Sequence, residues 1–201
     1  KGAPMQSQKP AETPEKKEPA SKRLSLIVAA YNVDPYIEKF FISVFSQSSK
    51  LRNFEVIVVD DGSEDDTAKI VKDWQSRYPK QIRYVHQENA GAAAARNTGL
   101  SLATGKWVCF TDPDDFLSVD YFREMLKETE VKHDKPLLAV ISNLVFFFED
   151  TNEYSDSHPL KYKFRSGTTR LSSDDLGSFI HLSGASIWVD RAAIKDLAFD
   201  S

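Results

Sequence analysis

Three carboxylates stand close together at Asp112, Asp114 and Asp115, directly after the apolar run of residues 107–110. Such a run predicts a buried strand, and the acids then lie at its C-terminal end, the edge where open α/β sheets bind ligands. Clustered carboxylates repel each other unless a positive group joins them. Because Mg²⁺ and Mn²⁺ prefer oxygen ligands, the cluster indicates a divalent cation. A cation at this edge of a parallel sheet in turn indicates a phosphate-bearing ligand.

A second acidic pair, Asp60 and Asp61, follows the apolar residues 54–59, and Tyr31 follows the apolar residues 24–30. If both runs are strands of one sheet, a carboxylate that can accept a hydrogen bond from a nucleobase meets a ring that can stack on that base. Taken alone, however, the acidic pair is better explained as charge at the start of the next helix, because strand–Asp–Gly turns are common.

Residues 91–103 predict a helix of small side chains, which permits close packing on a sheet and close approach of the backbone to a ligand. Arg96 is the lone cation in this helix. Its simplest role is an ion pair with a neighbouring carboxylate, and that pair would itself place Arg96 beside the acids. The chain contains no GxGxxG and no GxxxxGK[ST], which disfavours a Rossmann dinucleotide site and a P-loop.

Apolar runs alternate with amphipathic stretches from Leu24 onward, with short connections between them. This alternation predicts a parallel sheet covered by helices on both faces, an α/β fold. Asp34, followed by proline, and Ser63 are the expected caps of the first two helices. The predicted strands are residues 24–30, 54–59, 82–85 and 106–111.

The two ends of the chain differ from this middle part. Residues 1–23 carry four prolines, many Lys and Glu and no aromatic residue, which is typical of a flexible linker. After Lys135 the spacing is less regular: a long apolar run covers 137–148, and a helix at 172–182 and a strand at 185–189 are predicted. This part is expected to form a lid or the wall of a second-substrate site, for which His181 and Trp188 are candidate lining residues.

Composition excludes several classes. The 201 residues suffice for one good core, and a net charge of -4 gives no basic field for nucleic acid. The single cysteine, Cys109, rules out an internal disulfide framework and is expected to be a small core residue. No apolar stretch reaches the ~20 residues that span a bilayer, and no signal peptide is visible, so the expected location is cytoplasmic.

Four segments, taken together and in order, closely resemble the family 2 glycosyltransferases of the GT-A fold: LIVAAYNVDPYI, VIVVDDGSEDDT, ENAGAAAARNTGL and GKWVCFTDPDDF. The resemblance is strong over residues 24–130 and continues weakly to Ser201. It implies a Rossmann-like, mostly parallel sheet flanked by helices on both faces. Residues 24–130 would be the nucleotide-sugar-binding half, and 131–201 a partial acceptor half that is expected to be truncated. Ala29 stands where the family usually has proline.

The resemblance also implies a site. Tyr31 and Asp61 match residues that hold the nucleobase, usually uracil, and Arg96 lies in a segment that helps to bind the nucleotide. Asp112 matches an acid close to the ribose and the metal, and Asp114 matches the ligand of Mn²⁺ or Mg²⁺. The complete predicted nucleotide-sugar site is Ala30, Tyr31, Asn32, Asp61, Arg96, Asp112, Pro113, Asp114 and Asp115, with Asp115 supporting the loop and the sugar.

The implied reaction is an inverting transfer of a sugar from a nucleoside-diphosphate sugar, with a UDP-sugar as the expected donor. The acceptor would be a hydroxyl of a cell-surface glycan or polymer such as a polysaccharide or teichoic acid. No acid among Asp190, Asp196 and Asp200 is assigned as the catalytic base, which is expected beyond Ser201. Such enzymes work at the inner face of the cell membrane, so peripheral membrane association through parts outside this chain is also expected.

Two alternatives stay open at this point. A catalytically silent nucleotide-binding or interaction module could keep the same fold. A nucleotidyltransferase also uses carboxylates and Mg²⁺, but it would be expected to carry a Gly-rich loop with Lys or Arg after the first strand. This chain has Tyr31-Asn32-Val33-Asp34 there, which disfavours that alternative.

Overall fold

The computed structural model describes residues 23–47, 53–132, 134–157 and 187–200. Nearly all of the predicted linker, the predicted helix at 172–182 and His181 lie outside the described residues. The described ranges contain all four strands that the sequence predicts between residues 24 and 111.

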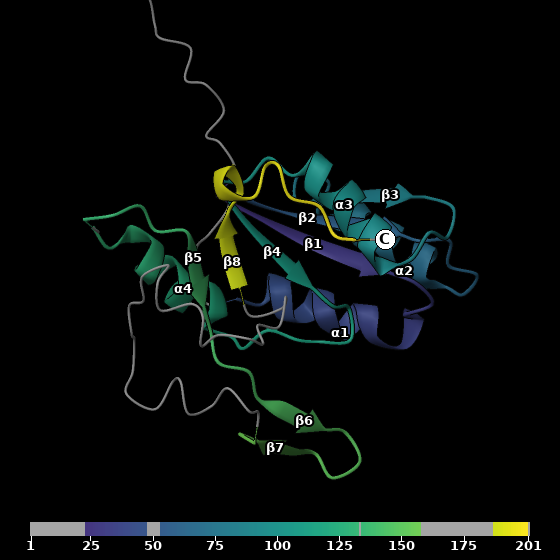
Figure 1. The fold of residues 1–201 in the computed structure, drawn as a ribbon. Helices are drawn as coiled ribbons and strands as arrows, with labels where there is room; N and C mark the ends of the chain where they lie inside the picture. Colours follow the sequence, from purple (N-terminus) through teal and green to yellow (C-terminus); the bar gives the residue numbers. More distant parts are fainter. Residues whose placement is uncertain (1–22, 48–52, 133, 158–186, 201) are drawn as a thin grey trace, which may run out of the picture.

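Six strands form one mixed sheet in the order β3-β2-β1-β4-β8-β5 (Figure 1). Their bounds are β1 Leu24–Ala30, β2 Phe54–Asp60, β3 Ile82–His86, β4 Trp107–Thr111, β5 Ala139–Ile141 and β8 Ile187–Asp190. The first four strands are parallel to one another, as the alternating pattern predicted. By contrast, β8 runs antiparallel to both β4 and β5.

Helices cover both faces of the sheet. The helices are α1 Asp34–Phe45, α2 Thr67–Arg77, α3 Ala92–Leu102 and α4 Tyr121–Glu130. Buried side chains of α1, α2 and α4 belong to one hydrophobic cluster, whereas α3 belongs to a second cluster with Ile27, Ile57 and Val108. A short hairpin of β6 Phe146–Phe148 and β7 Glu153–Ser155 extends away from the sheet (Figure 1).

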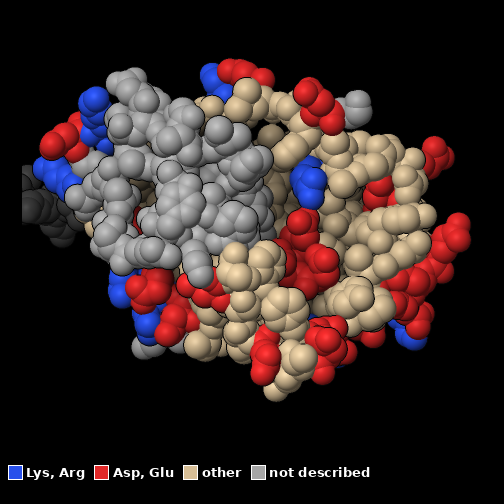
Figure 2. All heavy atoms as spheres, turned by 60° about the horizontal axis from the view of Figure 1, so that its bottom comes forward, with Lys and Arg blue, Asp and Glu red and all other residues tan. Residues whose placement is uncertain are grey.

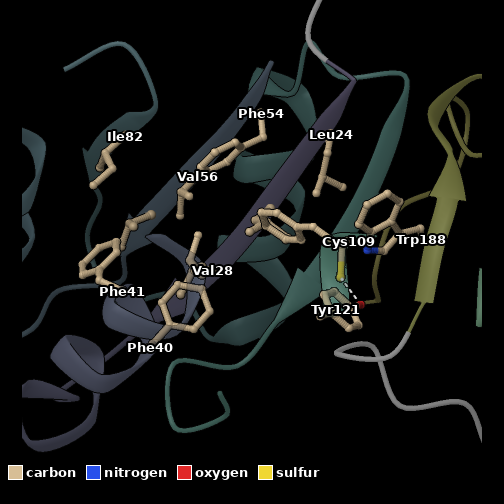
Figure 3. Packing of buried hydrophobic residues seen from close by; sticks show 14 of the residues in the cluster. Leu24, Val28, Phe40, Phe41, Phe54, Val56, Ile82, Cys109, Tyr121 and Trp188 are labelled. Carbon is tan, nitrogen blue, oxygen red and sulfur yellow. Dashed lines mark hydrogen bonds between the residues drawn. The ribbon is translucent and has the colours of Figure 1, made fainter. Parts of the chain in front are cut away.

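The period-two alternation of β1 explains the two clusters. Leu24, Leu26 and Val28 point into the larger one, and Ile27 points into the other, so the strand is apolar on both faces because both faces are covered. Figure 3 shows the larger cluster, in which Phe40 and Phe41 of α1 lie beside Val28 and Val56. Complete burial of such side chains contributes about 1.5–3 kcal/mol each.

The small residues of α3 let this helix lie close to the sheet. A methyl group in place of the Gly99 hydrogen would come within 2.3 Å of Cγ2 of Ile27, a distance at which atoms overlap. The close packing predicted for residues 91–103 is therefore confirmed. This packing brings the N-terminal half of α3, which carries Arg96, to the carboxyl end of the sheet.

Several local expectations were wrong. The helix caps are Val33 and Asp66, not Asp34 and Ser63. The Val33 carbonyl accepts the first helical hydrogen bond, from the Ile37 N–H at 3.0 Å, so Asp34 already lies in the first turn. The Ser63 hydroxyl instead accepts a hydrogen bond from the Asn32 N–H at 3.0 Å.

The core contains two further side chains that the sequence had singled out. Cys109 is fully buried, as expected. Trp188 is also fully buried, against Tyr121 and Phe122, so it does not line an acceptor site (Figure 3). An apolar, β-paired position on a central strand such as β8 favours packing over ligand contact.

None of the helices in the described ranges is long and apolar enough to cross a membrane.

Candidate functional site

The strand register explains why three loops meet at one edge of the sheet. Ala30, the last residue of β1, lies opposite Asp60, the last residue of β2, and Val28 lies opposite Thr111, the last residue of β4. The segments that follow these strands therefore leave the sheet side by side. They carry the predicted residues Tyr31, Asn32, Asp61, Asp112, Pro113, Asp114 and Asp115.

The loop after β4 exposes its acids. Asp114 and Asp115 are exposed, Asp112 is partly exposed, and Pro113 is buried beneath them. The Asp115 N–H donates to the Asp112 carbonyl at 3.2 Å, which folds the loop into a tight turn. Figure 2 shows acidic side chains gathered in a hollow on this face of the molecule. The chain thus presents several carboxylates to solvent at one point of the sheet edge.

The crowding of these acids has an electrostatic cost. Partial loss of hydration, and then the charges of Asp114 and Asp112, raise the pKa of Asp115 to about 6. A like charge disfavours ionisation, and an added cation would remove this effect. The donor set therefore fits a hard divalent ion.

Arg96 is the cation that this loop contacts. Its Nη2 donates to Oδ1 of Asp112 at 2.8 Å, with 28% of the Arg96 side chain and 48% of the Asp112 side chain exposed. This is the ion pair that the sequence predicted from a lone arginine in an apolar helix. It brings α3 and β4 together at the sheet edge.

The two acids at the end of β2, Asp60 and Asp61, are buried, unlike those after β4. Asp60 is fully buried and accepts hydrogen bonds from the Ser63 N–H at 2.9 Å and the Tyr84 hydroxyl at 2.5 Å. Nδ1 of His86 lies 3.1 Å from the same carboxylate. Burial alone would raise the pKa of Asp60, but the hydrogen bonds from these three residues outweigh it and lower the pKa. Asp60 therefore holds β2, β3 and the 61–66 loop together.

Asp61 is also buried, with 3% of its surface exposed. Its Oδ1 accepts from Nε2 of Gln87 at 2.7 Å and from the Ala90 N–H at 3.0 Å, and its Oδ2 accepts from the Gly91 N–H at 2.8 Å. In the structure, Asp61 thus fixes the loop that leads into α3. Its contact with a nucleobase stays a prediction.

Tyr31 is half exposed at the end of β1, whereas Ala30 before it is buried. Asn32 has a positive φ of 52° and ties the two neighbouring loops together: its Oδ1 accepts from the Glu64 N–H at 2.9 Å. The Val33 N–H donates to the Thr67 hydroxyl at 2.9 Å in the same way. These bonds fix the backbone that directly follows Tyr31, whose side chain is half exposed at this edge of the sheet.

Sequence reasoning missed four residues around this edge: Tyr84, His86, Gln87 and Asn97. The strand register supplies a signal for the first two, because Val58 and Asp60 lie opposite Tyr84 and His86, and directly opposite residues share a face of the sheet. Gln87 bridges Asp61 and the Thr98 hydroxyl, the latter at 2.8 Å. No sequence pattern identifies that bridge.

Within the described residues, no group of three or more His, Cys, Asp or Glu side chains converges as a closed metal cage. Mg²⁺ and related ions in phosphate-binding sites commonly use one or two carboxylates, with waters and substrate phosphates as the other ligands. Asp112 and Asp114 suit that open kind of site.

Comparisons with solved structures show the fold. The mannosyltransferase PcManGT from Pyrobaculum calidifontis, in complex with GDP-Man and Mn²⁺, is 24% identical with a TM-score of 0.65. The alignment covers 92% of this chain and 51% of that one. Staphylococcus aureus TarS 1-349 in complex with UDP is 23% identical with a TM-score of 0.56, over 87% of this chain and 48% of that one. The predicted GT-A arrangement, with a mostly parallel sheet between helices, is confirmed.

Curated relatives are similar in sequence over part of their length. The minor teichoic acid biosynthesis protein GgaB of Bacillus subtilis is 31% identical over 176 residues, which is 88% of this chain and 19% of that protein. Glycosyltransferase GlyA of Streptococcus pneumoniae is 42% identical over 106 residues, 53% of this chain and 15% of that protein. This chain therefore spans less than a fifth of either relative. The family model described as "Glycosyl transferase family 2" matches residues 25–198, and the chain belongs to that family.

Proposed function

We propose that this chain is the donor-binding part of an inverting glycosyltransferase that moves a sugar from a nucleoside-diphosphate sugar, with a UDP-sugar as the expected donor, to a hydroxyl of a glycan or polymer. The observation that carries the proposal is the meeting of Tyr31, the Arg96–Asp112 pair and the exposed acids Asp114 and Asp115 at one edge of the sheet. Family membership is consistent with this activity.

The site has two ends that suit the two ends of a nucleotide sugar. The half-exposed Tyr31 ring offers a stacking surface for a base, and base–aromatic stacking contributes about 1–3 kcal/mol. The diphosphate would lie toward the loop after β4. We assign Asp114 and Asp112 as the residues that hold Mn²⁺ or Mg²⁺ there. A bound ion of this kind supplies Lewis-acid stabilisation of the departing diphosphate.

Arg96 contributes a second positive group at the same end. It binds Oδ1 of Asp112, so coordination by Asp112 uses Oδ2 or displaces the guanidinium. In either geometry a guanidinium stands beside the negative charge that grows on the leaving group, and fixed positive charge of this kind lowers the barrier. Asp115 completes the loop on the sugar side of the site.

The proposed transfer also needs a base for the acceptor. An acceptor hydroxyl attacks the anomeric carbon from the face opposite the diphosphate, and a carboxylate or imidazole base removes its proton. Of the late acids, Asp190 is engaged in local structure, since its Oδ1 accepts from the Ala192 N–H at 2.9 Å. Asp190 is therefore not assigned as the base. A cell-surface polymer acceptor is supported by the name of GgaB as a teichoic acid biosynthesis protein.

A thermal-shift panel tests the donor site. UDP, CDP, GDP and their sugars are added to the chain with and without Mn²⁺. Bound ligand at about 100 times its Kd stabilises a protein by about 2.7 kcal/mol, which shifts the melting temperature by several degrees. We expect a Mn²⁺-dependent shift with UDP or UDP-sugars. Asp66→Asn, a change in an exposed acid of the 61–66 loop, serves as the matched control and should keep that shift. A panel with no shift for any nucleotide, even with Mn²⁺, contradicts the proposal.

A further inference from the structure

The segment of residues 197–200 lies on α3, where the side chain of Asn97 binds its backbone. Nδ2 of Asn97 donates to the Phe199 carbonyl at 3.0 Å, and the Phe199 N–H donates to Oδ1 of Asn97 at 2.8 Å. The amide of Asn97 therefore pairs with the backbone of Phe199 as a neighbouring strand would. Figure 1 shows the chain after β8 crossing to α3, far from it in sequence. We call residues 197–200 the crossing segment.

The apolar packing beneath the crossing segment is incomplete. A partly open apolar pocket of about 200 Å³ lies beside it, lined by residues that include Leu100, Phe110, Val189 and Ala198. The side chains of the segment border this pocket and do not fill it. The paired hydrogen bonds of Asn97 therefore fix the backbone of a segment that is only partly packed against its surroundings.

The attached segment places one ring beside the candidate site. The Phe199 ring meets the Phe110 ring edge to face, with centroids 4.8 Å apart. The Arg96 guanidinium lies over Phe199, 5.8 Å from the ring centroid, and the same guanidinium binds Asp112. A cation over an aromatic face is attracted to it, so the ring restricts where the guanidinium can go. A continuous series of contacts thus leads from Asn97 through Phe199 and Arg96 to Asp112.

We propose that Asn97 is a positioning residue of the donor site: its paired hydrogen bonds fix Phe199 against Phe110, and Phe199 holds Arg96 in reach of Asp112. Asn97 itself touches neither the acids nor a substrate. The inference rests on the proposed function for its consequence, since Arg96 and Asp112 are the residues assigned to the diphosphate end. The attachment itself does not depend on that assignment.

A spin label tests the attachment without any ligand. The only cysteine, Cys109, is fully buried, and burial raises the pKa of its thiol to about 12, so it stays unreactive toward a thiol reagent. A nitroxide on Asp200→Cys therefore reports the crossing segment alone. We expect its spectrum to show a markedly more mobile label when Asn97→Ala is added. Ser101→Ala, an exposed change one turn further along α3, is the matched control and should leave the spectrum unchanged.

The second measurement follows the consequence in the chain with its native Asp200. Asn97→Ala should weaken Mn²⁺-dependent UDP binding by about three- to tenfold, which corresponds to about 0.7–1.4 kcal/mol. Phe199→Ala should weaken it by a similar factor. Because both changes interrupt one series of contacts, the double variant should be no weaker than Phe199→Ala alone. A merely destabilising change in α3 would instead add its effect to that of Phe199→Ala.

The two measurements distinguish the attachment of the crossing segment from the positioning role of Asn97. An unchanged label spectrum in the Asn97→Ala variant overturns the attachment, whatever the nucleotide data show. A mobile label with unchanged UDP affinity, or with additive effects of Asn97→Ala and Phe199→Ala, overturns the positioning role. If the native chain binds no nucleotide, the proposed function fails and the positioning role fails with it, while the spectrum still decides whether Asn97 attaches the segment. A mobile label together with non-additive losses supports the inference.

Discussion

Two acidic clusters lie at the same edge of the sheet and follow similar apolar strands, yet their environments are opposite. Asp60, the last residue of β2, and Asp61 are buried and accept hydrogen bonds from Ser63, Tyr84, Gln87 and the backbone of residues 90 and 91. The acids after β4 are largely exposed and crowd one another. The chain thus supplies internal donors to the first cluster, which stabilise loops. The second cluster has its negative charge directed outward, where a ligand can meet it.

The largest effect that tests this contrast is on stability. Asp60→Ala should lower the free energy of unfolding by about 3 kcal/mol, because it removes a fully buried acceptor and leaves the partly buried donors of Ser63 and Tyr84 without their partner. Urea denaturation followed by tryptophan fluorescence measures the loss. Asp66→Ala removes an exposed carboxylate that lies 3.7 Å from Lys69. Although Asp66 is the cap residue of α2, its side chain makes no capping hydrogen bond, so the change should alter stability by no more than about 0.5 kcal/mol. Equal losses in the two variants would contradict the contrast.

Asp61→Asn should cause the second largest loss of stability. An asparagine keeps one acceptor oxygen but turns an NH₂ group toward donors that the carboxylate satisfied, and such a mismatch at a buried position costs about 2 kcal/mol. The same urea titration measures it. The UDP affinity of the Asp61→Asn variant is then compared with that of the native chain, under conditions where both proteins are folded. If Asp61→Asn abolishes UDP binding and leaves stability intact, Asp61 belongs with the ligand-facing acids, which is the role that the sequence resemblance implied.

For the exposed cluster the expectation is reversed. Asp114→Asn should leave the free energy of unfolding within about 0.5 kcal/mol of the native value, because Asp114 is exposed and no buried partner among the described residues loses its acceptor. It should weaken Mn²⁺-dependent UDP binding by about tenfold or more, or about 1.4 kcal/mol. Isothermal titration with and without Mn²⁺ measures both affinities. Unchanged affinity in the presence of Mn²⁺ would remove Asp114 from the metal site.

Features that are marked by residue type within one strand or helix could be predicted from the sequence. Apolar runs and their alternation with helical stretches predicted β1 to β4 and the sheet edge, because burial on both faces leaves a plain signature in residue type. The lone Arg96 in an apolar helix predicted its ion pair, because a half-buried cation needs a carboxylate partner. These signals are local to one element.

Features that depend on partners from elsewhere in the chain were not predictable. Asp61 binds mainly backbone N–H groups of residues 90 and 91, which every residue type except proline carries, so no pattern marks them. The insertion of β8 between β4 and β5 reverses direction within a parallel sheet and turns Trp188 into a core residue. The pairing of Asn97 with Phe199 joins residues 102 positions apart.

The smallest effect concerns pH and sharpens the contrast within the buried cluster. The pKa of Asp60 is lowered in the folded chain, so its ionised form adds stability above the unfolded-state pKa of about 4. That contribution is lost as the pH falls through the lower folded-state pKa. Tyr84→Phe removes one of the hydrogen bonds that lower this pKa and should cost about 1 kcal/mol at pH 7.

Below pH 4 the difference in unfolding free energy between Tyr84→Phe and the native chain should shrink. A protonated Asp60 accepts the Tyr84 hydrogen bond less strongly than the ionised carboxylate does. Urea titrations of both proteins at pH 7 and near pH 3 measure it. Tyr78→Phe, which changes a partly buried tyrosine on the same face of the sheet, is the control and should show no such convergence. A difference between native and Tyr84→Phe proteins that stays constant with pH would mean that the Tyr84 hydroxyl does not stabilise the ionised Asp60, and the buried cluster would then be held by its backbone donors.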